Sequence, residues 1–243
     1  LKDYITFKYK GGSYTKEIRS ENLYFLPGLT WSGITSGNPS FRFFESGCIF
    51  SSSGPSAFPK DHFEYILGLL NSSTGSLIFK LLSPTLSVLS GDIAKIPIKY
   101  QNVDDIKNIV TRLISVSKQD WDANETSWNF QTNELVSFDR EKYMDVMSDY
   151  ADFNNLLIDI APPHLNSLES RYELYKTKWE TNFRRLHANE EELNRYFIEI
   201  YGLQDELTPD VPLNEITILQ QGEIKISSNK IEFQANVVMK QLI

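Results

Sequence analysis

The feature that most constrains the fold is a long apolar stripe over residues 164–202. Large apolar side chains recur there at spacings of three and four residues, as on one face of an α-helix, with a slight phase shift before the last three: Leu165, Leu168, Tyr172, Tyr175, Trp179, Phe183, Leu186, Leu193, Phe197 and Ile200. A helix of this length spans roughly 50–60 Å at a rise of about 1.5 Å per residue. Such a helix must pair with another helix, as in a coiled coil, to remove the stripe from water.

The rest of the carboxy-terminal part is also predicted to be mainly helical. The apolar spacing indicates an amphipathic helix over residues 101–118 and another over residues 139–160. Gly202 is a natural end for the long helix, because glycine readily adopts the left-handed conformation. A small β-hairpin is expected near residues 215–227, and a final helix over residues 233–243.

The amino-terminal part carries a different pattern. Turn signals come there every eight to twelve residues, which is typical of irregular β-structure. The expected strands are short and fall at residues 4–9, 22–28, 40–44 and 47–54. Two short helices follow. The first runs over residues 61–72 with Asp61 as its N-cap, and Pro84 stops the second, over residues 74–83.

The charge follows the same division. The chain of 243 residues has a net charge of −8. Residues 1–100 hold ten Lys and Arg against seven Asp and Glu, whereas residues 101–243 hold fourteen against twenty-five, so the net charges are +3 and −11. Only the amino-terminal part is therefore suited to face phosphate. We predict an α+β protein, with an irregular β-rich domain over residues 1–100 and a helical spacer over residues 101–243.

The remaining composition bounds the setting of the chain. The single cysteine, Cys48, excludes an intramolecular disulfide and fits a reducing cytoplasm. No window holds the roughly 18 consecutive apolar residues of a membrane-spanning helix. The chain begins with Leu1 rather than Met, and its last residues read like the middle of a helix. We therefore expect a piece of a longer protein.

Motifs of catalysis and metal binding are weak. The sequence has no glycine-rich phosphate loop and no nucleophile elbow. The paired prolines Pro162 and Pro163 are read as a helix stop, and the three histidines and one cysteine lack the spacing of zinc ligands. Two acidic groups are weaker alternatives, a cation site or a metal-dependent nuclease core, although a solvated turn and a solvated hairpin explain them more simply. The residues concerned are Asp120, Asp122 and Glu125 for the first, and Asp210, Glu223 and Lys225 for the second.

A nucleic-acid surface is the better supported interpretation of the amino-terminal part. Basic side chains bind phosphate, Arg, Asn and hydroxyl groups read base edges, and aromatic faces stack on bases. The stretch Gly28–Gly37 carries Trp31 among small residues, so its indole either anchors the loop in a core or leans on a duplex. Its glycines are expected to let backbone amides reach phosphates. The candidate DNA-binding residues are Lys8, Lys10, Ser13, Tyr14, Lys16, Arg19, Trp31, Ser32, Thr35, Ser36, Asn38 and Arg42.

Several phrases of the chain resemble a known family. They are YKGGSYTKE, GLTWSGITSGNPSFRFFESGCIFSSSGPSAFP, ILGLLNS, SGDIAKIPI, ISVSKQDWDANETSWNF and ANEEELNRYFIEIYGLQDELTPDV. Together they resemble the carboxy-terminal part of adenine-specific DNA methyltransferases, above all the PglX type of bacterial phage-exclusion (BREX) systems. The matches fall in order over residues 8–130 and 186–212, while residues 133–165 match poorly.

The resemblance implies a recognition role rather than catalysis. Such enzymes use S-adenosylmethionine to methylate adenine within a short sequence of double-stranded DNA, and their catalytic domain lies upstream. Their carboxy-terminal region resembles the target-recognition domains of type I specificity subunits and type IIG restriction-modification enzymes. By this resemblance, the LLNS phrase lies on a helix beneath the reading surface and the GDIAKIPI phrase closes the recognition domain. The catalytic motifs are absent from this chain, so we expect neither activity nor a bound cofactor or metal in it.

Two classes of function therefore stay open. The first is a DNA target-recognition module that works with an upstream methyltransferase domain. The second is a protein-interaction module, in which the acidic helical half docks another phage-defence protein. Phosphate contacts make affinity fall steeply with salt, so salt dependence separates the two.

Overall fold

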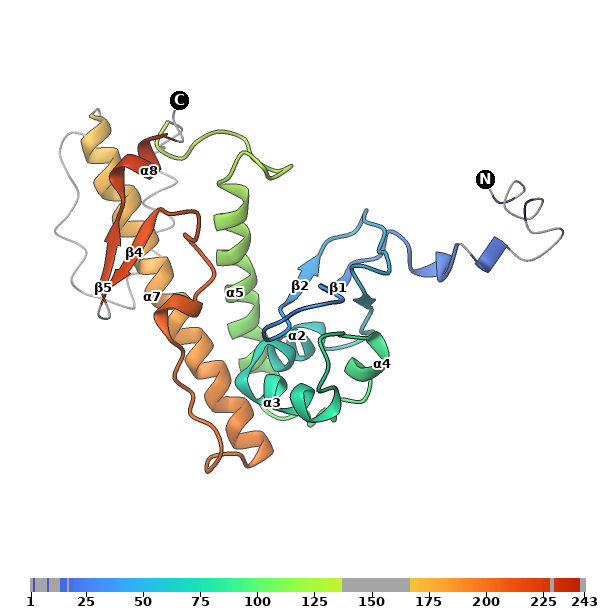
Figure 1. Ribbon diagram of the computed structural model, residues 1–243. Coiled ribbons are helices and arrows are strands. Elements are labelled where there is room, and N and C mark those ends of the chain that lie inside the picture. Colours follow the sequence, from blue (N-terminus) through green and yellow to red (C-terminus); the bar gives the residue numbers. More distant parts are fainter. Residues whose placement is uncertain are drawn as a thin grey trace. The chain divides into compact units, whose positions relative to one another are not determined.

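A computed structural model describes residues 2, 8, 14–16, 18–136, 167–227 and 230–240. It confirms the predicted α+β class, because helices and two small antiparallel sheets occur together (Figure 1). The chain divides into two compact units. Unit 1 comprises Leu1–Val110 and Leu193–Thr208, and unit 2 comprises Thr111–Glu192 and Pro209–Ile243.

The sheet of unit 1 has three short strands in the order β2-β1-β3, all antiparallel: β1 (Gly28–Trp31), β2 (Phe41–Phe44) and β3 (Ser56–Ala57). Two 3-10 turns precede them, η1 (Tyr14–Lys16) and η2 (Glu21–Leu23). Gly28 is required where the strands meet, since a Cβ there would lie 2.8 Å from the Ala57 carbonyl oxygen. Leu29, Trp31 and Phe41 bury their side chains and form the apolar side of this sheet.

Three helices complete the amino-terminal part of unit 1: α2 (Phe63–Asn71), α3 (Ser73–Leu82) and α4 (Ser90–Ile93). The residue that caps α2 is His62 rather than the predicted Asp61, and no side chain caps its amides. Ser72 caps α3, because its hydroxyl accepts a bond of 3.1 Å from the Gly75 amide. The close approach of the two helices requires glycine at 75, where a Cβ would lie 1.9 Å from the Leu69 carbonyl oxygen.

Two longer helices run through both units, α5 (Val103–Asp122) and α7 (Leu168–Tyr201). In unit 1, the first part of α5 and the last part of α7 bury apolar side chains: Ile106, Ile109, Val110, Leu193, Phe197, Ile198 and Ile200. Gly68 of α2 lies against Val110 and Leu193, so these helices close the core beneath α2.

Unit 2 is built on the central part of the long helix. Its core joins one residue of α5, three of α7 and three of the returning chain: Val116, Trp179, Phe183, Leu186, Ile216, Ile218 and Leu219. A β-hairpin of β4 (Ile224–Ser227) and β5 (Lys230–Phe233) packs on this core beside α7 (Figure 1). A 3-10 turn, η3 (Leu213–Glu215), precedes the hairpin and α8 (Ala235–Lys240) follows it. The apolar stripe of α7 is thus covered in unit 2 by α5 together with the returning chain, rather than by a helix alone.

The elements match most sequence-based expectations and correct some. The predicted strand over residues 47–54 is wrong, because Gly47 has a φ of 103° in a turn and no strand follows it before β3. The hairpin lies a few residues downstream of residues 215–227, since Leu219 and Gly222 both have positive φ and delay the first strand. The predicted helix over residues 139–160 lies outside the described residues, as does most of the predicted strand over residues 4–9.

Within the described residues, no single helix is both long and apolar enough to cross a membrane. Helices α2 and α3 reach that length and composition only as a pair, and they are bent by 76° at the break between them.

Candidate nucleic-acid interface

The candidate site centres on residues 32–38, hereafter loop 32–38, which directly follow β1. Exposure alternates along it: Ser32, Ile34 and Ser36 are exposed, whereas Gly33 and Thr35 are half-buried. Asn38 is exposed as well. The loop therefore presents hydroxyl and amide groups to solvent, together with one aliphatic side chain.

Trp31 anchors the start of this loop in the core. Only 2% of the residue is exposed, and its ring lies 5.4 Å from that of Phe41, measured between centroids. The indole Nε1 donates a hydrogen bond of 2.9 Å to the Val88 carbonyl. This corrects the interpretation in which Trp31 leans on a duplex, because the indole is covered by protein and its one polar group is engaged.

A second segment, residues 83–88 (hereafter turn 83–88), lies beside loop 32–38. Ile34 and Ser87 are partners in an antiparallel bridge. The Thr35 amide donates to the Leu86 carbonyl at 3.0 Å, and the Val88 amide donates to the Gly33 carbonyl at 2.9 Å. With the indole bond to Val88, three hydrogen bonds join segments that lie more than fifty residues apart in the sequence.

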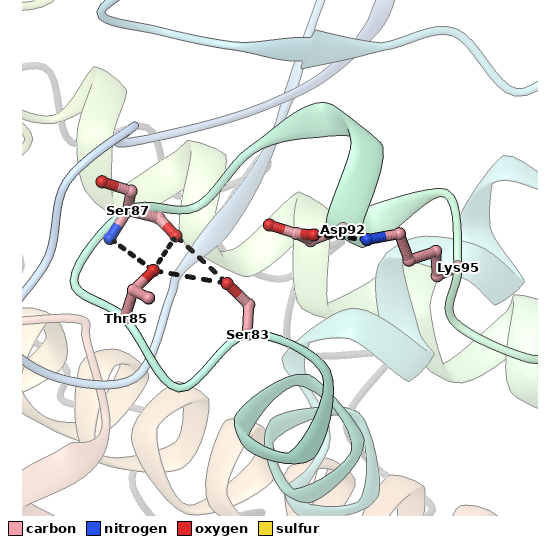
Figure 2. Close-up of polar contacts among 5 residues, drawn as sticks. All are labelled: Ser83, Thr85, Ser87, Asp92 and Lys95. Carbon is pink, nitrogen blue, oxygen red and sulfur yellow. Dashed lines mark hydrogen bonds and ion pairs between the residues drawn. The ribbon is translucent and has the colours of Figure 1, made fainter.

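Turn 83–88 is stabilised by its own hydroxyl groups (Figure 2). The Thr85 hydroxyl donates to the Ser87 carbonyl at 3.2 Å and accepts from the Ser87 amide at 3.3 Å. The Ser83 hydroxyl lies 3.4 Å from that of Thr85. These bonds fix the turn that carries Ser87 to the side of Ile34.

An ion pair follows the turn on α4. Lys95 donates to Asp92 at 2.9 Å, and the Lys95 side chain stays largely exposed (Figure 2). The Lys95 ammonium, helped by a hydrogen bond from Ser83, holds the pKa of Asp92 below its ordinary value. Asp92 is therefore ionised at neutral pH but neutralised by its partner, so it adds little repulsion toward an anion.

Arg42 lies on β2, and its Cα is paired with that of Thr30 on β1. The side chain is exposed, and within the described residues no hydrogen bond or ion pair engages it. Asn71 at the end of α2 holds the neighbouring backbone, because its Oδ1 accepts from the Phe41 amide and its Nδ2 donates to the Phe41 carbonyl, both at 3.0 Å. The amide of the LLNS phrase thus positions the strand that carries Arg42.

The glycines of loop 32–38 do not have the predicted role. The Gly33 amide donates to the Ser53 carbonyl at 3.2 Å, and the Gly37 amide donates to the Thr35 hydroxyl at 3.2 Å. Both amides are therefore engaged within the protein instead of being available to phosphate. A Cβ at Gly37 would meet nothing within 4 Å, so the outer side of the loop is open for close approach.

Local charge favours an anionic partner here more than total charge does. Unit 1 has twelve Lys and Arg and twelve Asp and Glu, so it is neutral and unit 2 carries the whole net charge of −8. The +3 counted over residues 1–100 is offset by acidic residues of α5 and of the chain after residue 192. Yet residues 22–44 and 65–91, which form the site, contain no Asp or Glu, only Arg42 and Lys80.

The amino-terminal candidates do not join this site in the described structure. The Tyr14 hydroxyl donates to Glu21 at 3.4 Å, and Lys2 pairs with the same carboxylate. Lys8 and Arg19 are exposed, and Lys16 belongs to η1. Lys10 and Ser13 lie outside the described residues.

The acidic alternatives have structural explanations in unit 2. Asp122 accepts from the Ser127 hydroxyl at 2.6 Å, and Asp120 accepts from the Leu219 amide at 3.0 Å, so both carboxylates organise backbone; Glu125 is exposed. Glu223 is buried, whereas Asp210 and Lys225 are exposed. Among residues 18–136, 167–227 and 230–240, no three His, Cys, Asp or Glu side chains are grouped to hold a metal ion.

Sequence reasoning missed turn 83–88 and Asn71 as parts of the site. The Ser-Pro-Thr-Leu-Ser run at residues 83–87 has turn chemistry that marks an ordered loop, although nothing in it names its partner. Asn71 carries a weak signal, since an amide at a helix end is free to bond to a neighbouring backbone.

Comparison with known proteins follows from this geometry. No family model matches the chain. The chain is 35% identical over 211 residues to the adenine-specific methyltransferase PglX of Lacticaseibacillus casei (strain Zhang), a match that covers 84% of this chain and 16% of that protein. It is 27% identical over 190 residues to the adenine-specific methyltransferase BrxX of Escherichia coli O9:H4 (strain HS), covering 74% of this chain and 15% of that protein. The chain spans about one sixth of the length of these curated relatives, and most of it is similar to a segment of adenine-specific methyltransferases.

Proposed function

We propose that the chain is the DNA target-recognition segment and helical spacer of a site-specific adenine DNA methyltransferase in a phage-defence system. The observation that carries this proposal is the similarity of 84% of the chain to one segment of an adenine-specific methyltransferase. The exposed polar edge formed by loop 32–38, turn 83–88 and Arg42 supports it, because this edge combines base-reading side chains with local absence of carboxylates.

In this proposal, recognition and chemistry are separate. Arg42 is suited to a guanine edge, since a guanidinium donates two parallel bonds to O6 and N7. The hydroxyls of Ser32 and Ser36 and the amide of Asn38 supply short, adaptable bonds to bases or phosphates. S-adenosylmethionine would bind to another part of the full-length protein, where methyl transfer to the adenine amine would occur. Unit 2 would connect the recognition edge to other parts of the protein.

One observation favours a second candidate, a protein-interaction module. Trp128 in unit 2 is 99% exposed, and Trp121 at the end of α5 is also exposed. Two exposed indoles on an acidic unit are suited to a protein partner, because aromatic side chains are enriched at the centres of interfaces. A nuclease gains no support, since the described residues offer no acidic group arranged for a metal.

The test maps methylated adenines by sequencing in cells with and without the full-length protein that carries this chain. One short motif methylated only in its presence is the expected result. Binding of the purified protein to a duplex with that motif should also weaken steeply with salt, by a slope of about −0.9 per phosphate contact on logarithmic axes. Unchanged methylation together with salt-insensitive binding would reject the proposal and favour the interaction module.

A further inference from the structure

Ile34 is the one large aliphatic side chain of loop 32–38, and 75% of it is exposed. Exposing an isoleucine forgoes about 1.5–3 kcal/mol of hydrophobic stabilisation relative to burial. Its neighbours in the loop are Ser32 and Ser36, both exposed, and its bridge partner is Ser87. The apolar side chain therefore stands among hydroxyl groups.

The backbone holds Ile34 in this position. The hydrogen bonds on either side of it, from Thr35 to Leu86 and from Val88 to Gly33, fix the bridge with Ser87. Trp31 binds Val88 from below, so the loop rests on a buried indole. Ile34 thus remains on the exposed side without a hinge that would let it fold into the core.

A small apolar group beside polar ones is what this arrangement fits. In the major groove of DNA, the C5-methyl of thymine lies beside the O4 acceptor of the same base and the N6 amine of its paired adenine. Any duplex site that contains a target adenine contains an A·T pair, and so displays such a methyl group. A protein partner of the usual kind presents a wider apolar patch, to which the exposed Leu86 and Leu89 would have to contribute.

We propose that Ile34 contacts the C5-methyl group of a thymine in the recognised DNA sequence, while the surrounding hydroxyls of Ser32, Ser36 and Ser87 face the polar edges of that base pair. This inference rests on the proposed function and adds to it a base-specific role for an apolar residue. It makes the chain sensitive to a methyl group that carries no hydrogen bond.

The test is a thermodynamic cycle between protein and DNA. Deoxyuridine replaces each thymine of the mapped motif in turn, which removes the methyl and keeps every hydrogen-bonding group. Dissociation constants at fixed salt are measured for the full-length protein and its Ile34→Ala and Ile34→Val variants. Leu81→Ala is the matched control, because Leu81 is 76% exposed in the same unit.

We expect one thymine position at which deoxyuridine weakens binding by about fourfold, the effect of losing one buried methyl group. Ile34→Ala should weaken binding to the natural motif by a similar factor, yet bind the deoxyuridine duplex as wild type does, while Ile34→Val stays intermediate. Leu81→Ala should bind and discriminate like wild type.

Two failures are distinguishable. If the wild type recognises its motif but Ile34→Ala and deoxyuridine have independent effects at every thymine, the inference about Ile34 is overturned while the proposed function stands. If the wild type shows no motif preference at all, the proposed function itself fails. If Ile34→Ala leaves DNA binding intact and instead disrupts association with another protein, the residue belongs to a protein interface and the inference is also overturned.

Discussion

Units 1 and 2 use polar groups in opposite ways. In unit 1, neutral side chains bind backbone at long range: the indole of Trp31 reaches Val88, and the amide of Asn71 reaches Phe41. In unit 2, carboxylates perform this task, as Asp120 does for the Leu219 amide. The site segments of unit 1 consequently lack acidic residues, whereas unit 2 is rich in them.

The titration of the buried carboxylates underlines this difference. Burial, followed by the charge of Glu223, raises the pKa of Asp120 to about 6. Burial, followed by the charge of Glu215, raises the pKa of Glu190 to about 7. Negative charge is therefore destabilising inside unit 2 and absent from the edge of unit 1. The comparison teaches that only unit 1 has a surface prepared for a polyanion.

The largest expected effect distinguishes a buried indole from an exposed one. Trp31→Ala should lower the free energy of unfolding by about 3–5 kcal/mol, because it leaves a cavity and an unpaired Val88 carbonyl. Trp128→Ala, at a residue that is 99% exposed, should change it by less than about 0.5 kcal/mol. Denaturant unfolding followed by circular dichroism measures both, and equal losses would show that Trp31 does not anchor unit 1.

The next effect concerns the clamp on β2. Asn71→Ala should cost about 2–3 kcal/mol of stability, since both the Phe41 amide and carbonyl lose their side-chain partner. Asn38→Ala, which removes an exposed amide from loop 32–38, should be nearly neutral for stability. If Asn71→Ala proves as neutral as Asn38→Ala in the same unfolding experiment, Asn71 does not position the strand that carries Arg42.

Arg42 should behave in the reverse manner. Arg42→Ala is expected to leave stability unchanged and to weaken specific DNA binding by about 1–3 kcal/mol if the guanidinium reads a guanine. Arg42→Lys should restore the charge without the two-pronged geometry, and so recover non-specific affinity better than sequence preference. Binding is measured at fixed salt with the full-length protein; unchanged affinity and unchanged preference would remove Arg42 from the site.

The smallest effect is a pH dependence confined to unit 2. Because the folded-state pKa of Asp120 lies above its ordinary value of 3.8, the folded state holds the proton more tightly, and stability rises as pH falls from about 7 toward 4. The gain should be about 1–2 kcal/mol for opening of the β4–β5 hairpin. Asp120→Asn keeps an oxygen for the Leu219 amide, and should reduce this dependence to what Glu190 contributes.

Hydrogen exchange, corrected for its intrinsic pH dependence, measures this in peptides from each unit. Peptides from α3 in unit 1 serve as the control. The pKa of Asp92 is lowered by Lys95, so its stabilising contribution is lost only below the ordinary value of 3.8. Hairpin protection that decreases between pH 7 and 5 would contradict the assigned burial of Asp120.

The elements that were predictable from sequence are those with strong local periodicity. The stripe on α7 and the proline after α3 placed both helices within a few residues, and the alternation of Phe41 and Phe43 placed β2. Each signal lies within a segment that folds on its own pattern. Gly202 ends α7 as expected, with a φ of 70°.

The candidate site was only partly predictable, because its geometry depends on contacts between distant segments. The sequence marks Arg42, Ser32 and Ser36 as suitable residue types, and the structure leaves all three exposed. Nothing local to Trp31 reveals that its partner is 57 residues away. The same holds for Asn71, whose preference for a backbone partner is visible but whose choice of Phe41 is set by packing of α2 on the sheet.

The most direct test of the central claim is a transfer of specificity. Residues 28–95 of the full-length protein are replaced by the matching segment of the L. casei relative, and methylated adenines are mapped in cells that carry either version. If this segment reads DNA, the methylated motif changes to that of the relative while methylation activity persists. An active chimera that still methylates the original motif would contradict the claim.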